Sequence, residues 1–137
     1  MTTLVFPYVE YPSPTFGVTL RPVVTLELYS ERFHIWVRVD KCLADTGADV
    51  SVIPLPLGRF LVGDETAGRP MTVSGLSPGT QTNAFLHVIQ CRLRDEMFEM
   101  PAALIETERA PIVFGRREAL DRFVVRFVSG TEVILDL

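Results

Sequence analysis

Cysteine and histidine are scarce in this chain of 137 residues, which contains two of each. Cys42 and Cys91 are too few and too far apart in the sequence for a disulfide framework or a zinc site, so we expect both to be small buried side chains. His34 and His87 have no acidic or cysteine neighbours at metal-ligand spacing. The sequence therefore predicts no metal site, and it shows no need for an organic cofactor.

The chain also lacks an excess of basic residues and any long apolar run. Its 13 Lys and Arg against 17 Asp and Glu give a formal charge of −4, without the basic stripe that phosphate backbones require. No apolar run is long enough to span a bilayer, and residues 1–7 lack the basic start and continuous apolar region of a signal peptide. We expect a cytoplasmic protein that binds neither nucleic acid nor membranes.

Hydrophobic residues make up 47% of the chain, which at this length is enough for one core but not for two well-formed domains. Residues 4–22 hold four prolines among aromatic residues, a composition that favours an extended arm over a helix or a central strand. The sequence therefore predicts an extended N-terminal arm at residues 1–22 and one domain at residues 23–137.

Seven β-prone runs follow the arm, separated by turn residues. They lie at residues 23–29, 33–39, 71–74, 80–93, 97–105, 124–127 and 132–137. The first two runs predict a hairpin, and the next two predict a second hairpin around a tip at residues 75–79. In the last run, Val133, Leu135 and Leu137 alternate onto one face, which predicts an apolar edge strand that seeks a partner. The apolar residues 57–62 are too few to show a period.

A polar loop with two carboxylates, Asp45 and Asp49, lies between two apolar segments of this β pattern. The turn Asp45-Thr46-Gly47 follows the end of one strand, and residues 50–53 indicate a strand that leaves it. Asp45 therefore projects from a β scaffold. A plain turn is one alternative, because aspartate and glycine dominate turns for local reasons.

A calcium-binding loop is a second alternative for this segment, suggested by the spacing of Asp45, Asp49 and Ser51. Gly47 replaces the second ligand of such a loop, and Val50 replaces its required glycine. Pro56 stands where the closing glutamate would be, so the sequence excludes a calcium loop.

Residues 43–51 resemble the active-site loop of the retropepsin-like aspartic peptidases. The family pattern is two apolar residues, Asp-Thr/Ser-Gly-Ala-Asp/Asn, any residue and Ser/Thr, and every position is filled here. The resemblance implies an all-β retropepsin-like acid protease fold with Asp45 as the catalytic residue. It places Thr46, Gly47 and Ala48 in the active-site loop, where Thr46 would turn its hydroxyl towards a second chain and Gly47 would leave room for water.

Residues 111–116 resemble the family's second signature, a buried apolar triplet closed by Gly-Arg and followed by a short helix, here expected at residues 118–123. Gly115 would let the strand pass beneath the active-site loop, where any side chain would collide. The resemblance implies that Arg116 pairs with Asp49, because a guanidinium can hold a carboxylate through two hydrogen bonds. The alternative is that Arg116 and Arg117 form a solvated helix start.

The hairpin around residues 75–79 occupies the place of the family's flap, a β-ribbon that closes over a bound peptide. The resemblance implies that this tip contacts substrate through Gly75, Leu76, Ser77 and Gly79. Pro78 departs from the glycine-rich tips of the family and offers no N–H to a substrate. An ordinary exposed hairpin is the alternative.

Amide hydrolysis by this chemistry needs two carboxyl groups around one water, one ionised as the base and one protonated as the acid. The chain has one Asp-Thr-Gly, and the resemblance gives Asp49 a structural partner. The second carboxyl must then come from a second copy, so we expect a homodimeric aspartic endopeptidase whose two-fold axis passes between paired Asp45 side chains. Its substrate would be an extended peptide held strand to strand beneath the flaps. The alternative function is a catalytically weak or inactive module that binds peptides or dimerises.

Overall fold

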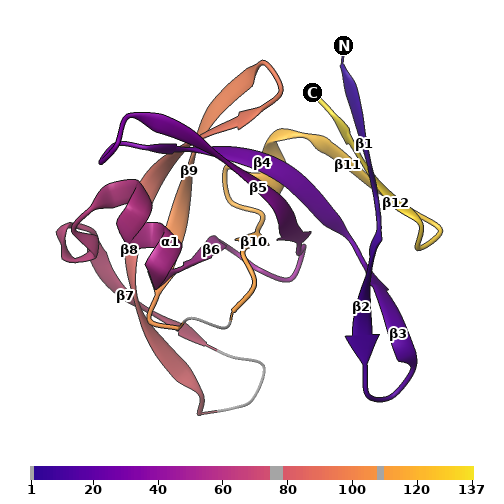
Figure 1. Ribbon diagram of the computed structural model, residues 1–137, viewed down its shortest axis with the longest axis horizontal. Helices are drawn as coiled ribbons and strands as arrows, with labels where there is room; N and C mark the ends of the chain where they lie inside the picture. The colour runs from indigo at the N-terminus through magenta and orange to yellow at the C-terminus, as the bar shows by residue number, and fades with distance from the viewer. Residues whose placement is uncertain (1, 75–78, 108–109) are drawn as a thin grey trace.

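Strands make up most of the computed structural model, which describes residues 2–74, 79–107 and 110–137 (Figure 1). The strands are β1 (Thr3–Pro7), β2 (Val9–Ser13), β3 (Gly17–Arg21), β4 (Val23–Ser30), β5 (Ile35–Ala44), β6 (Ser51–Pro54), β7 (Arg69–Ser74), β8 (Gln81–Leu93), β9 (Glu96–Ile105), β10 (Val113–Phe114), β11 (Val124–Val128) and β12 (Glu132–Asp136). The helical segments are α1 (Leu55–Val62) and two 3₁₀ turns, η1 (Glu65–Ala67) and η2 (Leu120–Arg122).

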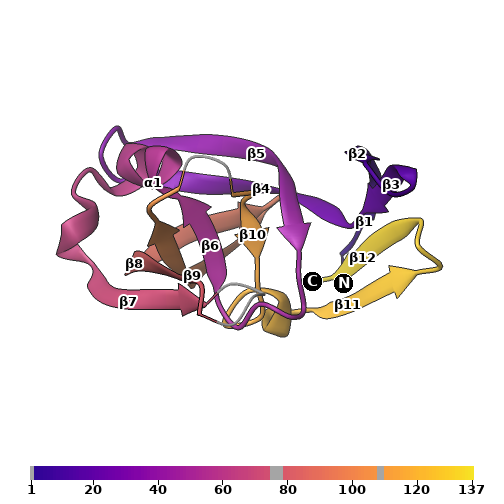
Figure 2. The same cartoon turned by 90° about the horizontal axis from the view of Figure 1, so that it is seen from below.

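Among the described residues, seven strands form the main sheet in the order β4-β5-β10-β6-β9-β8-β7, and an additional β4–β8 pairing closes part of this sheet on itself. Two smaller sheets, β1-β12-β11 and β2-β3, complete the fold. Figures 1 and 2 show the smaller sheets on one side of the main sheet, with both chain ends beside β11 and β12.

The core lies inside the curled main sheet. Val24, Leu26 and Leu28 alternate along β4 and are fully buried, as expected for a strand with one face on the core. Phe114 from β10 is also fully buried in this cluster, and Leu61 from α1 closes it from the helical side. The short β10 is therefore held firmly beneath the loop that joins β5 to β6.

Both hairpins predicted from the sequence are confirmed. β4 pairs with β5 antiparallel from Ser30↔Ile35 onward, and β7 pairs with β8 antiparallel from Ser74↔Gln81 onward. Strand β9 confirms the run predicted at residues 97–105. Residues 75–78 of the predicted flap tip lie outside the described residues.

The short helix predicted at residues 118–123 is confirmed only in part, because a 3₁₀ turn forms at Leu120–Arg122 and no α-helix does. Glu118 has a φ of +49°, a left-handed conformation that an α-helix cannot include, and only the 3₁₀ turn η2 follows it. The α-helix of the described chain is α1, in the segment whose period was too short to assign. Pro56 is compatible with α1 because it lies in the first turn, where backbone N–H groups have no helical partner. No helix of the described residues is long and apolar enough to cross a membrane.

The prediction that the chain finishes as an edge strand is also wrong. β12 lies between β1 and β11, with Leu4 opposite Leu135 on one side and Val125 opposite Leu135 on the other. Leu4 and Leu135 are both buried in the main core. The N-terminal residues are extended, as predicted: β1 occupies one edge of this small sheet, and β2 and β3 form a projecting hairpin (Figure 1).

Candidate active site

The loop from Asp45 to Val50 joins the end of β5 to the start of β6, and Asp45 lies at its base. The backbone N–H of Asp45 donates to the carbonyl oxygen of Phe114 at 3.1 Å, so the residue is fixed to the buried strand β10. Its carbonyl oxygen accepts the N–H of Ala48 at 3.2 Å. The side chain is half-buried, and its Oδ1 accepts the N–H of Gly47 at 2.9 Å. The carboxylate is thereby oriented by its own loop.

Gly47 and Thr46 form the exposed top of this loop. A Cβ atom added to Gly47 would lie 3.2 Å from Oδ1 of Asp45, so glycine keeps the space beside the carboxylate open. The hydroxyl of Thr46 has no hydrogen-bond partner among the described residues of this chain, and its side chain is exposed. This geometry is what the resemblance implies for a threonine that bonds to a second chain.

The end of β10 supports the loop from below. β10 pairs in parallel with β5, with Phe114 opposite Ala44, and antiparallel with β6. A Cβ atom added to Gly115 would lie 2.7 Å from both the carbonyl carbon and oxygen of Val50 and 2.9 Å from the carbonyl oxygen of Ala48. The close passage predicted for Gly115 is therefore confirmed.

Three backbone donors after β10 lock the loop in place. The N–H of Gly115 donates to Oγ of Ser51 at 3.0 Å, and this hydroxyl is fully buried. The N–H of Arg116 donates to the carbonyl oxygen of Ala48 at 2.9 Å. The N–H of Arg117 donates to the carbonyl oxygen of Asp49 at 3.0 Å. Ser51 therefore has a structural reason for its place in the motif that the sequence alone did not reveal.

The side chains of Asp49 and Arg116 form an ion pair across the loop. The structure thus brings together the two residues that the resemblance pairs. The side chain of Asp49 is 89% exposed and that of Arg116 is 45% exposed in the single chain. An exposed pair contributes at most about 1 kcal/mol, because water screens the attraction.

A cleft of about 630 Å³ opens beside Asp45. Its volume lies within the range typical of ligand sites. One wall comes from β7, through Met71, Thr72, Val73 and Ser74. The floor and far wall come from the loop and the strands beneath it: Asp45, Gly47, Ala48, Asp49, Val50, Val52 and Val113. The β7–β8 hairpin predicted as the flap therefore supplies residues to the same cleft as Asp45. Of the predicted flap-tip residues, Gly79 is described, with a φ of +85°, and Gly75, Leu76 and Ser77 lie outside the described residues.

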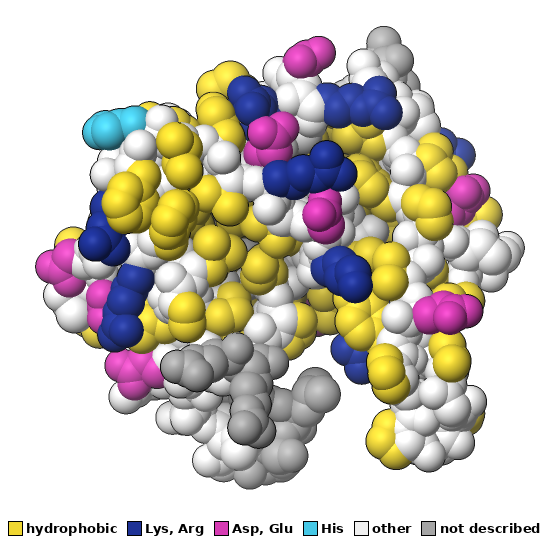
Figure 3. All heavy atoms as spheres, viewed as in Figure 1, with side chains coloured by type: hydrophobic (Ala, Val, Ile, Leu, Met, Phe, Trp, Pro, Cys, Tyr) yellow, Lys and Arg dark blue, Asp and Glu magenta, His cyan; other side chains and the backbone are white. Residues whose placement is uncertain are grey.

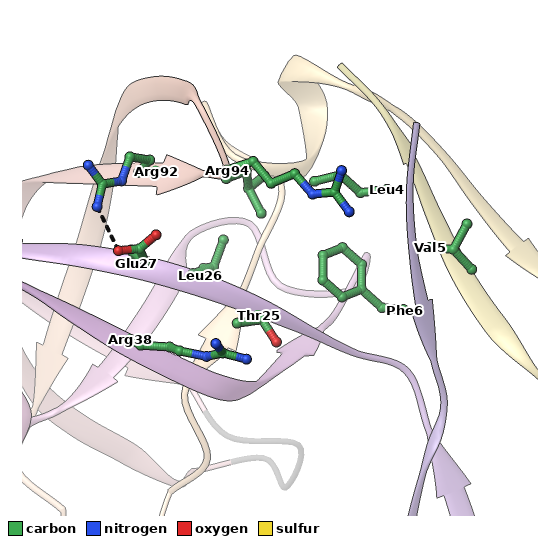
Figure 4. Close-up of a pocket in the computed structure, with 10 residues that line it drawn as sticks. Leu4, Val5, Phe6, Thr25, Leu26, Glu27, Arg38, Arg92 and Arg94 are labelled. Carbon is green, nitrogen blue, oxygen red and sulfur yellow. Dashed lines mark hydrogen bonds and ion pairs between the residues drawn. The ribbon is translucent and has the colours of Figure 1, made fainter. Parts of the chain in front are cut away.

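A second cavity, of about 290 Å³, lies between β1 and the strands β4, β5 and β8 (Figure 4). Its carboxylate, Glu27, pairs with Arg92 at 2.7 Å. Apolar side chains such as Leu4 and Phe6 line part of it, and Thr25, Arg38 and Arg94 also line it. Among the described residues that line this cavity there is no second carboxyl, and Glu27 is held by Arg92, so it offers no counterpart to the Asp45 cleft.

The two cysteines lie away from the cleft, and both are fully buried, as predicted. Burial raises the pKa of each thiol to about 12, and the neighbouring Cys91 adds to the effect on Cys42. Neutral buried thiols are inert, so neither cysteine is a candidate nucleophile.

Solved structures provide the comparison that bears on this fold. The chain is similar to a retropepsin-like aspartic protease from Rickettsia conorii, with a TM-score of 0.62 and 14% identity over 98% of this chain and 92% of that chain. It is also similar to the EIAV protease in complex with the inhibitor HBY-793, with a TM-score of 0.48 and 18% identity over 70% of this chain and 82% of that chain. Neither the protein-family models nor the curated proteins give a match. The first likeness shows that this chain has the retropepsin-like fold, as its two sequence signatures predict.

The sequence did not identify the apolar walls of the cleft. Val50, Val52 and Val113 come from β6 and β10, whereas Met71 and Val73 come from β7. The apolar character of each short run was visible, but their convergence depends on the parallel β6–β9 pairing and on the return of β8 along β9. These long-range registers carry no local sequence signal.

Proposed function

We propose that this protein is an aspartic endopeptidase in which the Asp45 carboxyls of two chains activate one water for attack on a peptide bond. The observation that carries the proposal is the Asp45 carboxylate itself, which is held by the N–H of Gly47 at the edge of a cleft of peptide-binding size. In this chemistry one carboxyl takes a proton from the water while the other, protonated, polarises the scissile carbonyl.

The second carboxyl comes from another copy of the chain in this proposal. Asp49 is the acidic residue nearest in the loop, but its side chain is paired with Arg116 and stands 89% exposed. A two-fold axis beside Asp45 would place the same residue on both sides of the reacting water, as an isologous interface does. It would also give the exposed hydroxyl of Thr46 a partner on the opposite loop.

The shape and lining of the cleft support an extended peptide as the substrate. β7 is the last strand in the order of the main sheet, so one of its edges is unpaired among the described residues. A peptide added to that edge would gain backbone hydrogen bonds, and the side chains beneath it would meet an apolar wall. Val52, Val73 and Val113 in that wall favour apolar residues next to the cleaved bond.

The test is hydrolysis of a mixed peptide library by the purified protein, from acidic to neutral pH, with and without a statine-type transition-state mimic. Asp45→Asn keeps the size of the side chain and removes its ionisable group, so hydrolysis should vanish while peptide binding survives. Asp95→Asn, in the exposed turn between β8 and β9, is the matched control and should retain full activity.

The pH dependence provides a second readout of the same mechanism. One carboxyl must be ionised and the other protonated, so the rate should rise and then fall with pH, with its maximum on the acid side of neutral. Activity that survives Asp45→Asn, or that rises steadily towards alkaline pH, would remove Asp45 from its role. Peptide binding without hydrolysis by the wild type would favour the inactive binding module instead.

A further inference from the structure

The β2–β3 hairpin stands apart from the rest of the fold. Its strands pair only with each other among the described residues, with Glu10 opposite Leu20 and Pro12 opposite Val18. A two-stranded hairpin is marginally stable in water unless one of its faces packs against something else. The hairpin therefore needs a surface to cover one of its faces.

The two faces of this hairpin differ in what covers them. Tyr11 belongs to the face that meets its own chain, because the Lys41 ammonium of β5 lies 5.8 Å from the centre of its ring. Residues that alternate with Tyr11 point the other way. On that opposite face, Val18 and Leu20 are 51% and 48% exposed, and Phe16 at the tip is 79% exposed. The apolar face is the one that its own chain leaves uncovered, and hydrophobic side chains are visible along the hairpin in Figure 3.

The position of the hairpin indicates what covers this face. Figure 1 shows β2–β3 and the β7–β8 hairpin projecting on the same side of the molecule, with the segment between β5 and β6 between them. Figure 2 looks onto this side, and Figure 3 shows the surface hollowed next to the β2–β3 hairpin. A second copy that brings its Asp45 to the Asp45 of this chain must approach on the same side.

The size of a stable interface gives a further reason to include the hairpin. A standard interface uses about 20–30 residues on each partner, or about 800 Å². The loop between Ala44 and Ser51 supplies six residues at most, which is too few. The hairpin adds two strands of five residues each, and it projects on the same side of the molecule as the β7–β8 hairpin.

We propose that the β2–β3 hairpin is a dimerisation arm, which packs the face formed by Glu10, Pro12, Val18 and Leu20 against a second copy of this chain. The inference rests on the proposed function for the identity of the partner. By two-fold symmetry each copy gives one arm and receives one, so a single substitution in the arm acts twice in every dimer.

Leu20→Lys tests the arm without weakening the hairpin itself, because the new ammonium faces Glu10 across the strand pair. Ile35→Lys is the matched control. Ile35 is 47% exposed against 48% for Leu20, and it starts β5, roughly 30 Å along the strand from its Asp45 end. Sedimentation velocity over a range of protein concentrations measures the dimer dissociation constant of the wild type and both variants, and thermal unfolding checks that all are folded.

We expect Leu20→Lys to raise the dimer Kd about tenfold for each arm, and hence about a hundredfold for the dimer, with Ile35→Lys unchanged. Equal Kd values for Leu20→Lys and the wild type would overturn the proposal. A normal dimer Kd together with a raised KM for peptide in Leu20→Lys would also overturn it, because the hairpin would then contact substrate and not a second copy. A wild type that stays monomeric at all concentrations would also overturn it.

The activity assay separates this inference from the proposed function. If the protein is a peptidase, Leu20→Lys should lose activity when dilute and regain the wild-type specific activity at concentrations above its raised Kd. A wild-type dimer that is weakened by Leu20→Lys but hydrolyses no peptide would leave the arm in place and refute the peptidase. If the protein hydrolyses peptides and Leu20→Lys has no effect at any concentration, the peptidase proposal stands and the dimerisation arm is refuted.

Discussion

Replacing Gly115 by alanine places a methyl group against backbone atoms that cannot move aside. The added Cβ would lie 2.7 Å from the carbonyl carbon and oxygen of Val50 and 2.9 Å from the carbonyl oxygen of Ala48. Flexible side chains can yield to such a contact, but these atoms belong to the active-site loop itself. Overpacking typically costs about 1–3 kcal/mol, and the rigid neighbours put this site at the upper end of that range.

The destabilisation of Gly115→Ala can be measured in two ways, as a lower Tm and as a lower kcat. A loss of about 3 kcal/mol in a chain of this length lowers the Tm by roughly 10 °C. The loop must also move away from Gly115, which strains the bonds from Arg116 to Ala48 and from Gly115 to Ser51. A displacement of about 1 Å in a catalytic group can reduce kcat about a hundredfold. We therefore expect the peptidase activity of Gly115→Ala to fall well below what its folded fraction explains.

Gly130→Ala is the control for this experiment. Gly130 lies in the turn between β11 and β12 with a φ of +68° and nothing within 4 Å of an added Cβ, so alanine there strains only the backbone. This control should cost about 1–2 kcal/mol and leave activity per folded molecule unchanged. A Gly115→Ala protein that melts with the wild type, at matched protein concentration, would show that the loop does not rest on this strand as described.

Arg116→Ala should lower the free energy of unfolding by no more than about 1 kcal/mol, because the ion pair with Asp49 is exposed and the backbone hydrogen bond from residue 116 survives the substitution. Urea unfolding of this variant, with Arg117→Ala as the control, measures the difference. A loss of several kcal/mol would mean that a partner chain buries the pair. Cys42 and Cys91 should resist iodoacetamide at pH values near 8 until the protein unfolds, which mass spectrometry can follow, and rapid labelling of the folded protein would contradict their burial. Burial raises both thiol pKa values from 9.0 to about 12. The contribution of the two thiols to stability is therefore complete below about pH 9 and is lost as the pH rises towards 12. The urea concentration at the unfolding midpoint should fall across that pH range.

Local sequence patterns were sufficient for the elements that carry the site. The strand-turn-strand pattern around Asp45 predicted the loop, and the resemblance of residues 111–116 to the family's second signature predicted the close passage of Gly115. Both signals are local: a glycine where no side chain fits, and a turn between β-prone runs. The cytoplasmic location, the division of the chain at residue 22 and the role of the flap tip stay predictions.

The errors arose where a pattern has two physical solutions or where the partner is distant in the sequence. A proline such as Pro56 can end a strand, but it is equally compatible with the first turn of a helix, which is where it lies in α1, so its presence does not distinguish the two. The sequence of β12 indicates one apolar face, but nothing in that pattern indicates that Asp136 pairs with Thr3 at the other end of the chain.

The correction to β12 changes where a partner chain is expected to bind. An unpaired C-terminal edge would have supplied a simple reason for dimerisation, but β1 and β11 already occupy both edges of that strand. The surfaces that the single chain leaves without cover are instead the top of the active-site loop, at Thr46 and Gly47, and the apolar face of the β2–β3 hairpin at Val18 and Leu20. The β2–β3 hairpin and the β7–β8 hairpin project on the same side of the molecule, with the segment between β5 and β6 between them (Figure 1). In the proposed dimer, one second copy of the chain would cover both surfaces at once, and the same contact would supply the second Asp45 carboxyl that the proposed chemistry requires.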